Sequence, residues 1–372
     1  MTLAREVGQL LTVGFDGTHP PDELLRRIAT SEVGGVMLFR PNVESPAQVA
    51  SAVGAVRGAS PTDGPPCLVA VDQEGGLVQR LRAPLTVWPD MLSVGAAGDP
   101  ALTERVGRAL GDELAALGIG WDFAPVLDVH TNPDNPVIGN RAFGTTPEAV
   151  ATHALAFWRG LRGAGVLGCG KHFPGHGDTR TDSHLDLPVV DHPLERLRRI
   201  ELAPFAAAAR AGIDSIMTAH VVFPQLDPGR PATLSPRILT DLLRGELGFT
   251  GVIVSDDLGM KAVADRYPID ELAVLAVAAG ADVLLIREPL ERQSRAFEAL
   301  VRAAEKDAHL RRRVTESAAR VAALKAACRV GAPAPRAMLP SLLGPPAHRA
   351  LAGSFARVDA RSAAASSPVA DA

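Results

Sequence analysis

The chain has 372 residues, of which 47% are hydrophobic and 22% are charged. This composition is typical of a globular protein with a large core. Its 38 basic and 42 acidic residues give a net charge of −4. No basic stripe interleaved with aromatic residues is visible, so we do not expect nucleic-acid binding.

The sequence contains no uncharged apolar run long enough to span a bilayer. Near the N-terminus, Glu6 comes too early for the apolar core of a secretory signal. We therefore expect a cytoplasmic protein without membrane contact. Cys67, Cys169 and Cys328 are too widely spaced to form a close metal-binding or redox pair, and we interpret them as free, mostly buried thiols.

Short apolar runs alternate with segments of helical periodicity along most of the chain. The predicted strands are 10–15, 35–39, 67–71, 121–127, 166–170, 215–218, 252–255 and 283–286. The clearest helical patterns are 101–117, 197–211, 269–279, 291–304 and 310–328. Such alternation is typical of β and α units around a parallel sheet. It fits either a TIM-type (β/α)8 barrel or an open doubly wound sheet.

Polar motifs decide between these two folds, because they follow the predicted strands directly. They are Asp72 to Gly76, Lys171-His172, Ala219-His220 and Asp256-Asp257. Residues at the carboxyl ends of so many strands meet in space only at one face of a closed barrel. We predict a single-domain TIM-type barrel over residues 1–330. Residues 331–372 form a Pro/Ala-rich C-terminal extension that we expect to be largely disordered toward its end.

Two adjacent carboxylates, Asp256 and Asp257, end the predicted strand 252–255. Neighbours on an extended chain point to opposite faces, so one should face the barrel mouth while the other supports it from behind. The alternative is that one of them caps a following helix.

A loop rich in His, Asp and Gly follows the predicted strand 166–170. In it, the spacing of Asp182 and His184 allows a carboxylate to hold and polarise an imidazole, which can then transfer protons near neutral pH. A metal site is the competing interpretation, because five side chains are plausible ligands: His172, His176, Asp178, Asp182 and His184. No motif fixes them on one rigid element, so we predict neither a metal nor a cofactor.

Further polar side chains follow the predicted strands at dispersed positions. They are Asp72, Arg80, Arg141, Lys171 and His172. Together they provide several hydrogen-bond donors and one acceptor, which suits a neutral polyhydroxyl ligand. Each could alone be an ordinary surface ion pair. Their shared position after strands favours a binding site.

From about residue 5 to about residue 325 the sequence resembles the family 3 glycoside hydrolases. It is most similar to their single-domain β-N-acetylhexosaminidase branch, which acts in bacterial cell-wall recycling. The segments that carry the resemblance are Lys171 to Gly177 with Asp182-Ser183-His184, Ser255 to Met260, and Asp72 to Arg80. One departure is Leu77, which stands where similar sequences commonly have Arg.

The resemblance implies a retaining enzyme in which Asp256 is the nucleophile. His184 would be the general acid and base, and Asp182 would hold its tautomer. The positions of Asp72, Arg80, Arg141, Lys171 and His172 match those that hold the hydroxyls and acetamido group of a terminal N-acetylglucosamine. Retaining glycosidases usually employ two carboxylates, so an imidazole acid/base is unusual.

We therefore expect a monomeric exo-β-N-acetylglucosaminidase with a small glycan substrate such as a muropeptide. Alternatives are a family 3 β-glucosidase, a phosphorylase that uses phosphate in place of water, a metal-dependent hydrolase and a non-catalytic glycan-binding protein.

Overall fold

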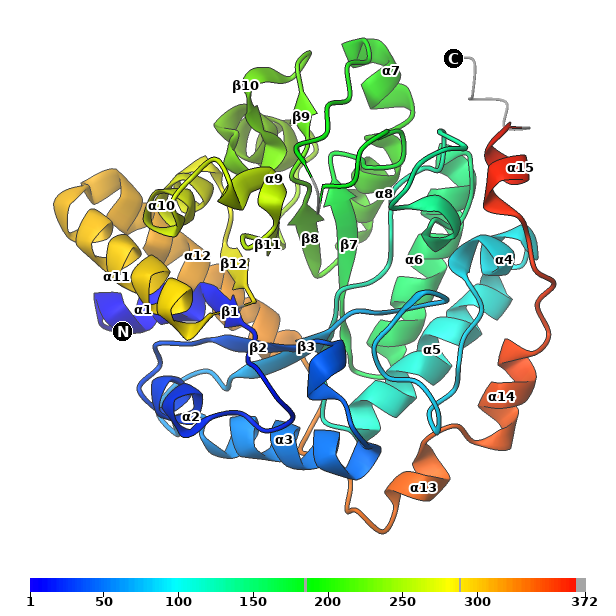
Figure 1. Cartoon of the computed structure of the whole chain (residues 1–372), viewed down its shortest axis with the longest axis horizontal. Helices are drawn as coiled ribbons and strands as arrows, with labels where there is room; N and C mark the ends of the chain where they lie inside the picture. The colour runs from blue at the N-terminus through cyan, green and yellow to red at the C-terminus, as the bar shows by residue number, and fades with distance from the viewer. Residues whose placement is uncertain (184–185, 288, 366–372) are drawn as a thin grey trace.

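The computed structural model describes residues 1–183, 186–287 and 289–365. Eight parallel strands close into a barrel in the order β1-β12-β11-β8-β7-β6-β3-β2, and helices surround it (Figure 1). The barrel strands are β1 (Leu11–Val13), β2 (Gly35–Leu38), β3 (Leu68–Val71), β6 (Trp121–Asp122), β7 (Leu167–Phe173), β8 (Ser215–Thr218), β11 (Val252–Asp257) and β12 (Val283–Ile286). This architecture confirms the predicted TIM-type barrel and excludes the open sheet.

All eight predicted strands are present, and two of them extend into the polar motifs that were predicted to follow them. β7 continues through Lys171 and His172, and β11 continues through Asp256 and Asp257, so these residues form the last part of each strand. β6 is shorter than predicted, although Val126 still forms a bridge with Lys171. Side chains at the ends of β7 and β11 are therefore held by the sheet itself.

The outer layer consists of helices that follow the strands. In the first half of the chain they are α1 (Leu3–Gln9), α2 (Asp22–Ala29), α3 (Pro46–Gly58), α4 (Met91–Ala96), α5 (Pro100–Ala116) and α6 (Pro147–Gly163). In the second half they are α7 (Leu194–Arg199), α8 (Ala203–Ala211), the π-helix η4 (Arg237–Glu246), α9 (Lys261–Ala264), α10 (Ile269–Ala279), α11 (Leu290–Lys306) and α12 (Ala308–Ala327). The helix predicted over 197–211 is two helices, because Pro204 cannot continue a helical hydrogen-bond ladder and instead starts α8.

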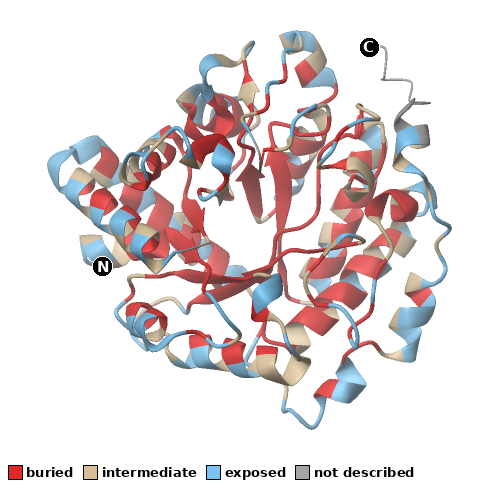
Figure 2. Cartoon of the chain, viewed as in Figure 1, coloured by how far each residue is buried: buried red, intermediate tan, exposed pale blue. Residues whose placement is uncertain are grey.

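The barrel strands are buried, and the helices around them are exposed on their outer sides (Figure 2). Alternation along the strands separates two apolar layers. In β3, Leu68 and Ala70 pack inside the barrel, while Val69 and Val71 belong to the cluster beneath the helices. The interior also holds Trp121, whose ring meets that of Phe123 edge-on at 4.8 Å between centroids. The barrel is thus filled with side chains and leaves room for a ligand only at an end.

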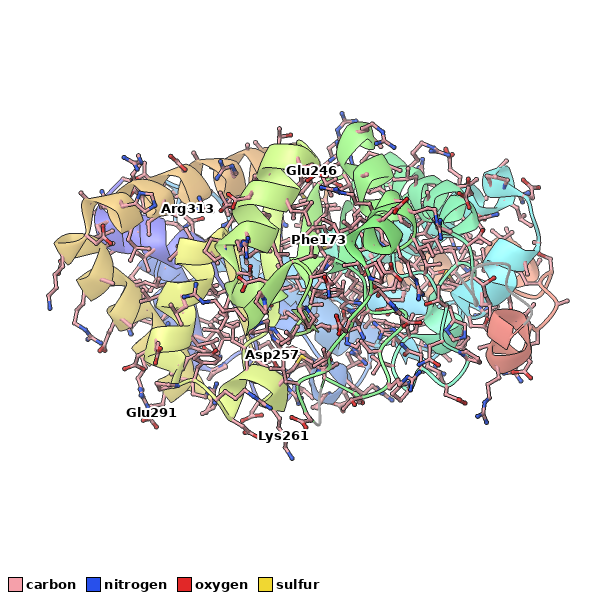
Figure 3. The ribbon with its side chains drawn as sticks, turned by 90° about the horizontal axis from the view of Figure 1, so that it is seen from above. Phe173, Glu246, Asp257, Lys261, Glu291 and Arg313 are labelled. Atoms are coloured by element: carbon pink, nitrogen blue, oxygen red, sulfur yellow. The ribbon has the colours of Figure 1, made fainter. Side chains whose placement is uncertain are left out.

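Two antiparallel hairpins extend the loops of the barrel. One consists of β4 (Gln73–Gly75) and β5 (Val78–Gln79), and the other of β9 (Val222–Phe223) and β10 (Asp227–Pro231). Seen from the side, Asp257 and Lys261 lie toward one face of the molecule, whereas Glu246 and Arg313 lie toward the other (Figure 3). The carboxyl ends of the strands therefore define one face.

The C-terminal extension runs along the outside of the barrel past α5 and α4 (Figure 1). It contains α13 (Leu339–Leu342), α14 (Pro346–Ala352) and α15 (Ala360–Ala365). Leu339, Leu343 and Leu351 are buried, and His348 Nδ1 lies 2.8 Å from Glu113 Oε1 of α5. The division at residue 330 stays a prediction. The expected disorder at the end falls partly on residues 366–372, which lie outside the described residues.

Within the described part of the chain, no helix is both long enough and apolar enough to cross a bilayer. The three cysteines are free thiols, and Cys67 and Cys169 are buried as predicted, while Cys328 is partly exposed. Burial raises the pKa of Cys67 and of Cys169 to about 12, so both thiols stay protonated and unreactive at neutral pH.

Candidate active site

A pocket of about 220 Å³ opens at the carboxyl ends of the barrel strands. Six of the eight predicted site residues line it: Asp72, Arg80, Arg141, Lys171, His172 and Asp256. An apolar wall that includes Met37, Phe39, Met217 and Leu285 completes it. A few polar groups that converge beside an apolar wall are typical of a small-molecule site.

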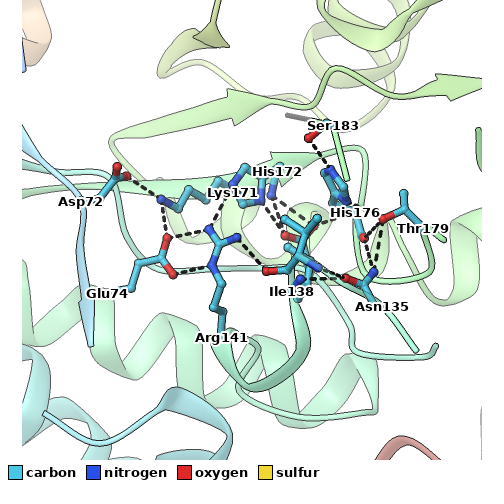
Figure 4. A network of polar contacts seen from close by, with 12 residues as sticks. Asp72, Glu74, Asn135, Ile138, Arg141, Lys171, His172, His176, Thr179 and Ser183 are labelled. Carbon is cyan, nitrogen blue, oxygen red and sulfur yellow. Dashed lines mark hydrogen bonds and ion pairs between the residues drawn. The ribbon is translucent and has the colours of Figure 1, made fainter. Parts of the chain in front are cut away.

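Lys171 lies at the centre of the polar side of this pocket (Figure 4). β7 directs its ammonium group between two carboxylates, with Nζ 2.8 Å from Asp72 Oδ1 and 2.6 Å from Glu74 Oε1. Both acids follow β3, so the contact joins segments about a hundred residues apart in the sequence. Arg80 extends the network, with Nη2 3.0 Å from Asp72 Oδ2.

Arg141 forms the second half of the network through a bidentate ion pair. Its Nε and Nη2 donate to the two carboxylate oxygens of Glu74 at 2.9 and 2.8 Å. The short 3-10 helix η2 (Gly139–Arg141) positions it, and Nη1 donates to the Val137 carbonyl at 3.1 Å. Two parallel hydrogen bonds to a carboxylate fix the plane of a guanidinium. One face of the pocket is therefore rigid before any ligand binds.

The opposite charges keep these buried groups ionised. Burial raises the pKa of Asp72, but attraction to Lys171 and Arg80 outweighs it and lowers the pKa below its usual value. The pKa of Glu74 is also lowered, because Arg141 and Lys171 outweigh its burial. Burial lowers the pKa of Lys171, yet the two carboxylates raise it overall. The polar side thus presents fixed charges rather than groups that exchange protons near neutral pH.

Asp256 and Asp257 end β11 and differ in their hydrogen bonds, while the prediction that only one of them faces the barrel mouth stays a prediction. Asp257 Oδ1 accepts hydrogen bonds from the backbone nitrogens of Gly259 and Arg287, at 2.9 and 3.1 Å. Asp256 Oδ1 accepts the backbone N–H of Asp257 at 2.8 Å, and both residues line the pocket. Neither residue caps a helix, because the N-cap of α9 is Met260. The helix-cap alternative is therefore wrong.

The loop after β7 is tied to the barrel by buried side chains. His176 Nδ1 lies 2.8 Å from Thr179 Oγ1, and its Nε2 lies 3.0 Å from Ser183 Oγ. Asn135 donates from Nδ2 to the His176 carbonyl at 2.9 Å (Figure 4). Ser183 lines the pocket, and its neighbour in the sequence, Asp182, is partly exposed. His184 lies outside the described residues, so the predicted Asp182–His184 pair remains a prediction.

Three of the five side chains considered as metal ligands have partners within the protein. His172 contacts Asp128, His176 contacts Thr179 and Ser183, and Asp178 contacts His192 at 2.5 Å. Over residues 1–183, 186–287 and 289–365, no three His, Cys, Asp or Glu side chains are grouped so that they could hold a metal ion.

The burial of His176 predicts acid sensitivity of this loop. Burial lowers its pKa to about 4, whereas an unfolded histidine titrates near ~6.5. Below pH 6.5 the unfolded chain binds the proton first, so the folded state loses stability as the pH falls from about 6.5 to about 4. The loss should reach about 3 kcal/mol. Urea unfolding of the wild type and of His176→Gln at pH 7 and pH 4 measures it. His19→Gln, at an exposed position, is the control, and equal pH dependence in all three proteins would contradict the prediction.

Two carboxylates of this site were not among the predicted site residues. Glu74 was part of the Asp72 to Gly76 motif, but nothing local distinguished it as the partner of Lys171 and Arg141. Asp128 directly follows the predicted strand 121–127, the same signal that found the other residues. It is fully buried and accepts a hydrogen bond from His172. Arg287 was also missed; its guanidinium lies 4.8 Å from the centre of the Phe39 ring at the pocket wall.

Comparison with known proteins identifies the family. Residues 2–324 match the Glycosyl hydrolase family 3 N terminal domain. The chain belongs to glycosyl hydrolase family 3. It is therefore a glycoside hydrolase, which confirms the predicted family and enzyme class.

Individual relatives agree with this assignment. A Beta-hexosaminidase from Stenotrophomonas maltophilia is 40% identical over 286 residues, which cover 75% of this chain and 84% of that protein. Beta-hexosaminidase A from Pseudoalteromonas piscicida is 38% identical over 364 residues, or 91% of this chain; the chain spans 60% of the length of that relative. The structure of a family 3 β-N-acetylglucosaminidase from Paenibacillus sp. superposes with a TM-score of 0.89 at 43% identity, covering 95% of this chain and 68% of that one.

Proposed function

We propose that this family 3 chain is a retaining exo-β-N-acetylglucosaminidase that acts in the cytoplasm on peptidoglycan-derived fragments. Asp256 attacks the anomeric carbon, the bond to the leaving oxygen breaks, and a covalent glycosyl-enzyme forms. His184, held by Asp182, first protonates the leaving oxygen and then takes a proton from the water that releases the sugar. The network around Lys171 holds the sugar.

The single observation that carries this proposal is the pocket itself. Its volume of about 220 Å³ is below the ~300–1,000 Å³ of pockets that hold drug-sized ligands, as suits one terminal sugar. Asp256 lines it together with the fixed charges of Lys171, Arg141 and Asp72. A nucleophilic carboxylate in the same pocket as rigid hydrogen-bonding groups fits attack on a held pyranose.

The charges of the other pocket acids support a separate proton donor. Asp72 and Glu74 are held as anions by their cationic partners, so neither has a proton to give at neutral pH. Burial raises the pKa of Asp257, which also lines the pocket, but its Oδ1 accepts hydrogen bonds from the backbone nitrogens of Gly259 and Arg287. His176 is neutral, and both of its ring nitrogens have partners within the protein. The Asp182–His184 pair, predicted from the motif spacing, meets this need.

Activity assays test the substrate and the reaction. We expect kcat/KM for 4-nitrophenyl β-N-acetylglucosaminide to exceed that for the matching β-glucoside by at least about 100-fold, because a site built for the acetamido group discriminates against its absence. In phosphate buffer the product should be free N-acetylglucosamine. Preference for the glucoside would indicate a β-glucosidase, and formation of a sugar phosphate would indicate a phosphorylase.

The acid role of His184 predicts a dependence on the leaving group. His184→Ala should lower kcat/KM by about 10²–10⁴-fold for chitobiose, whose leaving sugar needs a proton. The loss should stay within about 10-fold for a 2,4-dinitrophenyl glycoside, whose leaving group departs as an anion. Steady-state kinetics on both substrates check this, and equal losses would remove the acid role from His184.

A further inference from the structure

Asp128 is a fully buried carboxylate just beneath the pocket, and no role has been assigned to it so far. It follows Leu127, whose backbone nitrogen donates to the Lys171 carbonyl at 2.6 Å, so the backbone places it against β7. Its side chain does not line the pocket. Any effect on the reaction must therefore pass through the residues that it contacts.

The Asp128 carboxylate contacts two histidines, one at the end of β7 and one at the start of the following loop. Oδ2 lies 2.7 Å from His172 Nδ1, and both oxygens lie 3.2 Å from the His172 backbone nitrogen. Oδ1 accepts the backbone N–H of His176 at 2.6 Å. A carboxylate that accepts several hydrogen bonds is stabilised as the anion. The pKa of Asp128 is accordingly lowered, because its attraction to His172 and its hydrogen bonds outweigh burial.

An anionic Asp128 determines which nitrogen of His172 carries hydrogen. A carboxylate only accepts, so Nδ1 must be the protonated nitrogen. On the other side of the ring, Arg141 Nη2 lies 3.5 Å from Nε2. A guanidinium only donates, so it also disfavours hydrogen on Nε2. In the neutral ring Nε2 then carries the lone pair, which Arg141 faces at 3.5 Å and which a ligand hydroxyl would occupy in place of Arg141.

The same carboxylate reaches the loop of the proposed acid/base. Asp128 holds the backbone of His176, and the His176 ring holds Ser183 through Nε2 at 3.0 Å. Ser183 stands between Asp182 and His184 in the sequence. A continuous chain of hydrogen bonds thus runs from Asp128 to the residue between the two members of the proposed pair.

We propose that Asp128 is a positioning residue that fixes the Nδ1–H tautomer of the sugar-binding His172 and anchors the loop that carries Asp182 and His184. This inference rests on the proposed function, because the proposed function assigns sugar binding to His172 and the acid/base role to His184. Outer partners of this kind orient the groups that touch a ligand, as carboxylates do for metal-bound histidines.

Asp122 offers a matched control. It is also fully buried, and its Oδ1 also accepts a backbone N–H, from Gln73 at 2.9 Å. Within the described part of the chain, its side chain makes no hydrogen bond to a pocket histidine. Burial raises the pKa of Asp122 well above the usual value, so an amide should replace its carboxyl group with little electrostatic change. Asp122→Asn therefore tests the loss of a buried acid without the loss of a histidine partner.

The first test is the tautomer in the wild type, which does not depend on any variant folding. Nitrogen-15 NMR of histidine-labelled protein at pH 8, assigned with His172→Gln, should show hydrogen on Nδ1 of His172 and a bare Nε2. In Asp128→Asn the amide nitrogen would face Nδ1, so the hydrogen should move to Nε2. Hydrogen on Nε2 in the wild type would overturn the tautomer assignment, whether or not the enzyme cleaves N-acetylglucosaminides.

The second test is kinetic. Asp128→Asn should lower kcat/KM for 4-nitrophenyl β-N-acetylglucosaminide by about 100-fold, whereas Asp122→Asn should stay within about 5-fold. The loss of kcat/KM in Asp128→Asn should be larger for chitobiose than for the 4-nitrophenyl substrate, because displacement of the loop also impairs protonation of the leaving sugar. Equal losses on the two substrates would overturn the loop anchor. A wild type that cleaves neither substrate would refute the proposed function instead, and the NMR result would still stand alone.

Discussion

Asp256→Ala should lower kcat/KM for 4-nitrophenyl β-N-acetylglucosaminide by about 10⁴-fold or more. Loss of an attacking nucleophile removes the covalent route, and losses of this size follow when nucleophiles are removed from other hydrolases. The backbone of β11 should keep its place, because the neighbouring Asp257 remains bonded to the amides of Gly259 and Arg287. The protein should therefore fold normally but fail to turn over.

A trapped intermediate tests the nucleophile directly. Intact-protein mass after incubation with a 5-fluoro N-acetylglucosaminyl donor should show one added sugar on the wild type and none on Asp256→Ala. Peptide mapping should place the sugar on the segment Ser255-Asp256-Asp257. Asp257→Asn is the matched control and should still form the adduct. If the wild type hydrolyses substrate but never forms an adduct, Asp256 loses its role and the reaction proceeds by inversion or substrate assistance.

Glu74→Gln should cost about 3–5 kcal/mol of folding free energy, the range for breaking a buried ion pair. The side chain is 1% exposed and joins Lys171 to Arg141, so its loss leaves two buried cations with Asp72 as the remaining acid of the network. Urea unfolding at pH 7 measures the change. KM for the N-acetylglucosaminide should also rise, since both cations would lose their fixed positions.

Asp112→Asn is the control for this prediction. It breaks the Arg108–Asp112 pair on α5, in which the side chains are 55% and 43% exposed. Exposed pairs contribute about 0–1 kcal/mol, so its effect should be small. A loss below about 1 kcal/mol in Glu74→Gln would show that Lys171 and Arg141 find other partners.

Comparison of prediction and structure shows how far local patterns reach. An apolar run predicts a barrel strand, because successive residues of such a strand are buried in turn against the barrel interior and against the surrounding helices. β8 and β12 therefore have the predicted bounds, and the positions of Lys171 and Asp256 followed from the strands that precede them. Pro204, which lies at the start of α8, was visible in the sequence, but the helical pattern on both sides of it led to the prediction of one continuous helix.

Contacts between residues far apart in the sequence could not be predicted from local patterns. Glu74 and Asp128 have few local features that distinguish them from other acids near strand ends, and their partners on β7 become neighbours only when the barrel closes. The C-terminal extension is rich in Pro and Ala, and helical spacing of its leucines is limited to the short segment Leu339 to Leu343. Leu339 and Leu351 are nevertheless buried, because the barrel offers an existing surface for them.

Local sequence patterns were enough to predict the barrel, the strand ends on which the site is built, and the family to which the chain belongs. These depend on hydrophobic alternation and on short motifs, both of which act over a few residues. The tertiary structure alone decided which carboxylate holds which cation and how His172 is oriented. Those choices depend on distances between groups far apart in the chain, and on burial that strengthens the attraction between their charges.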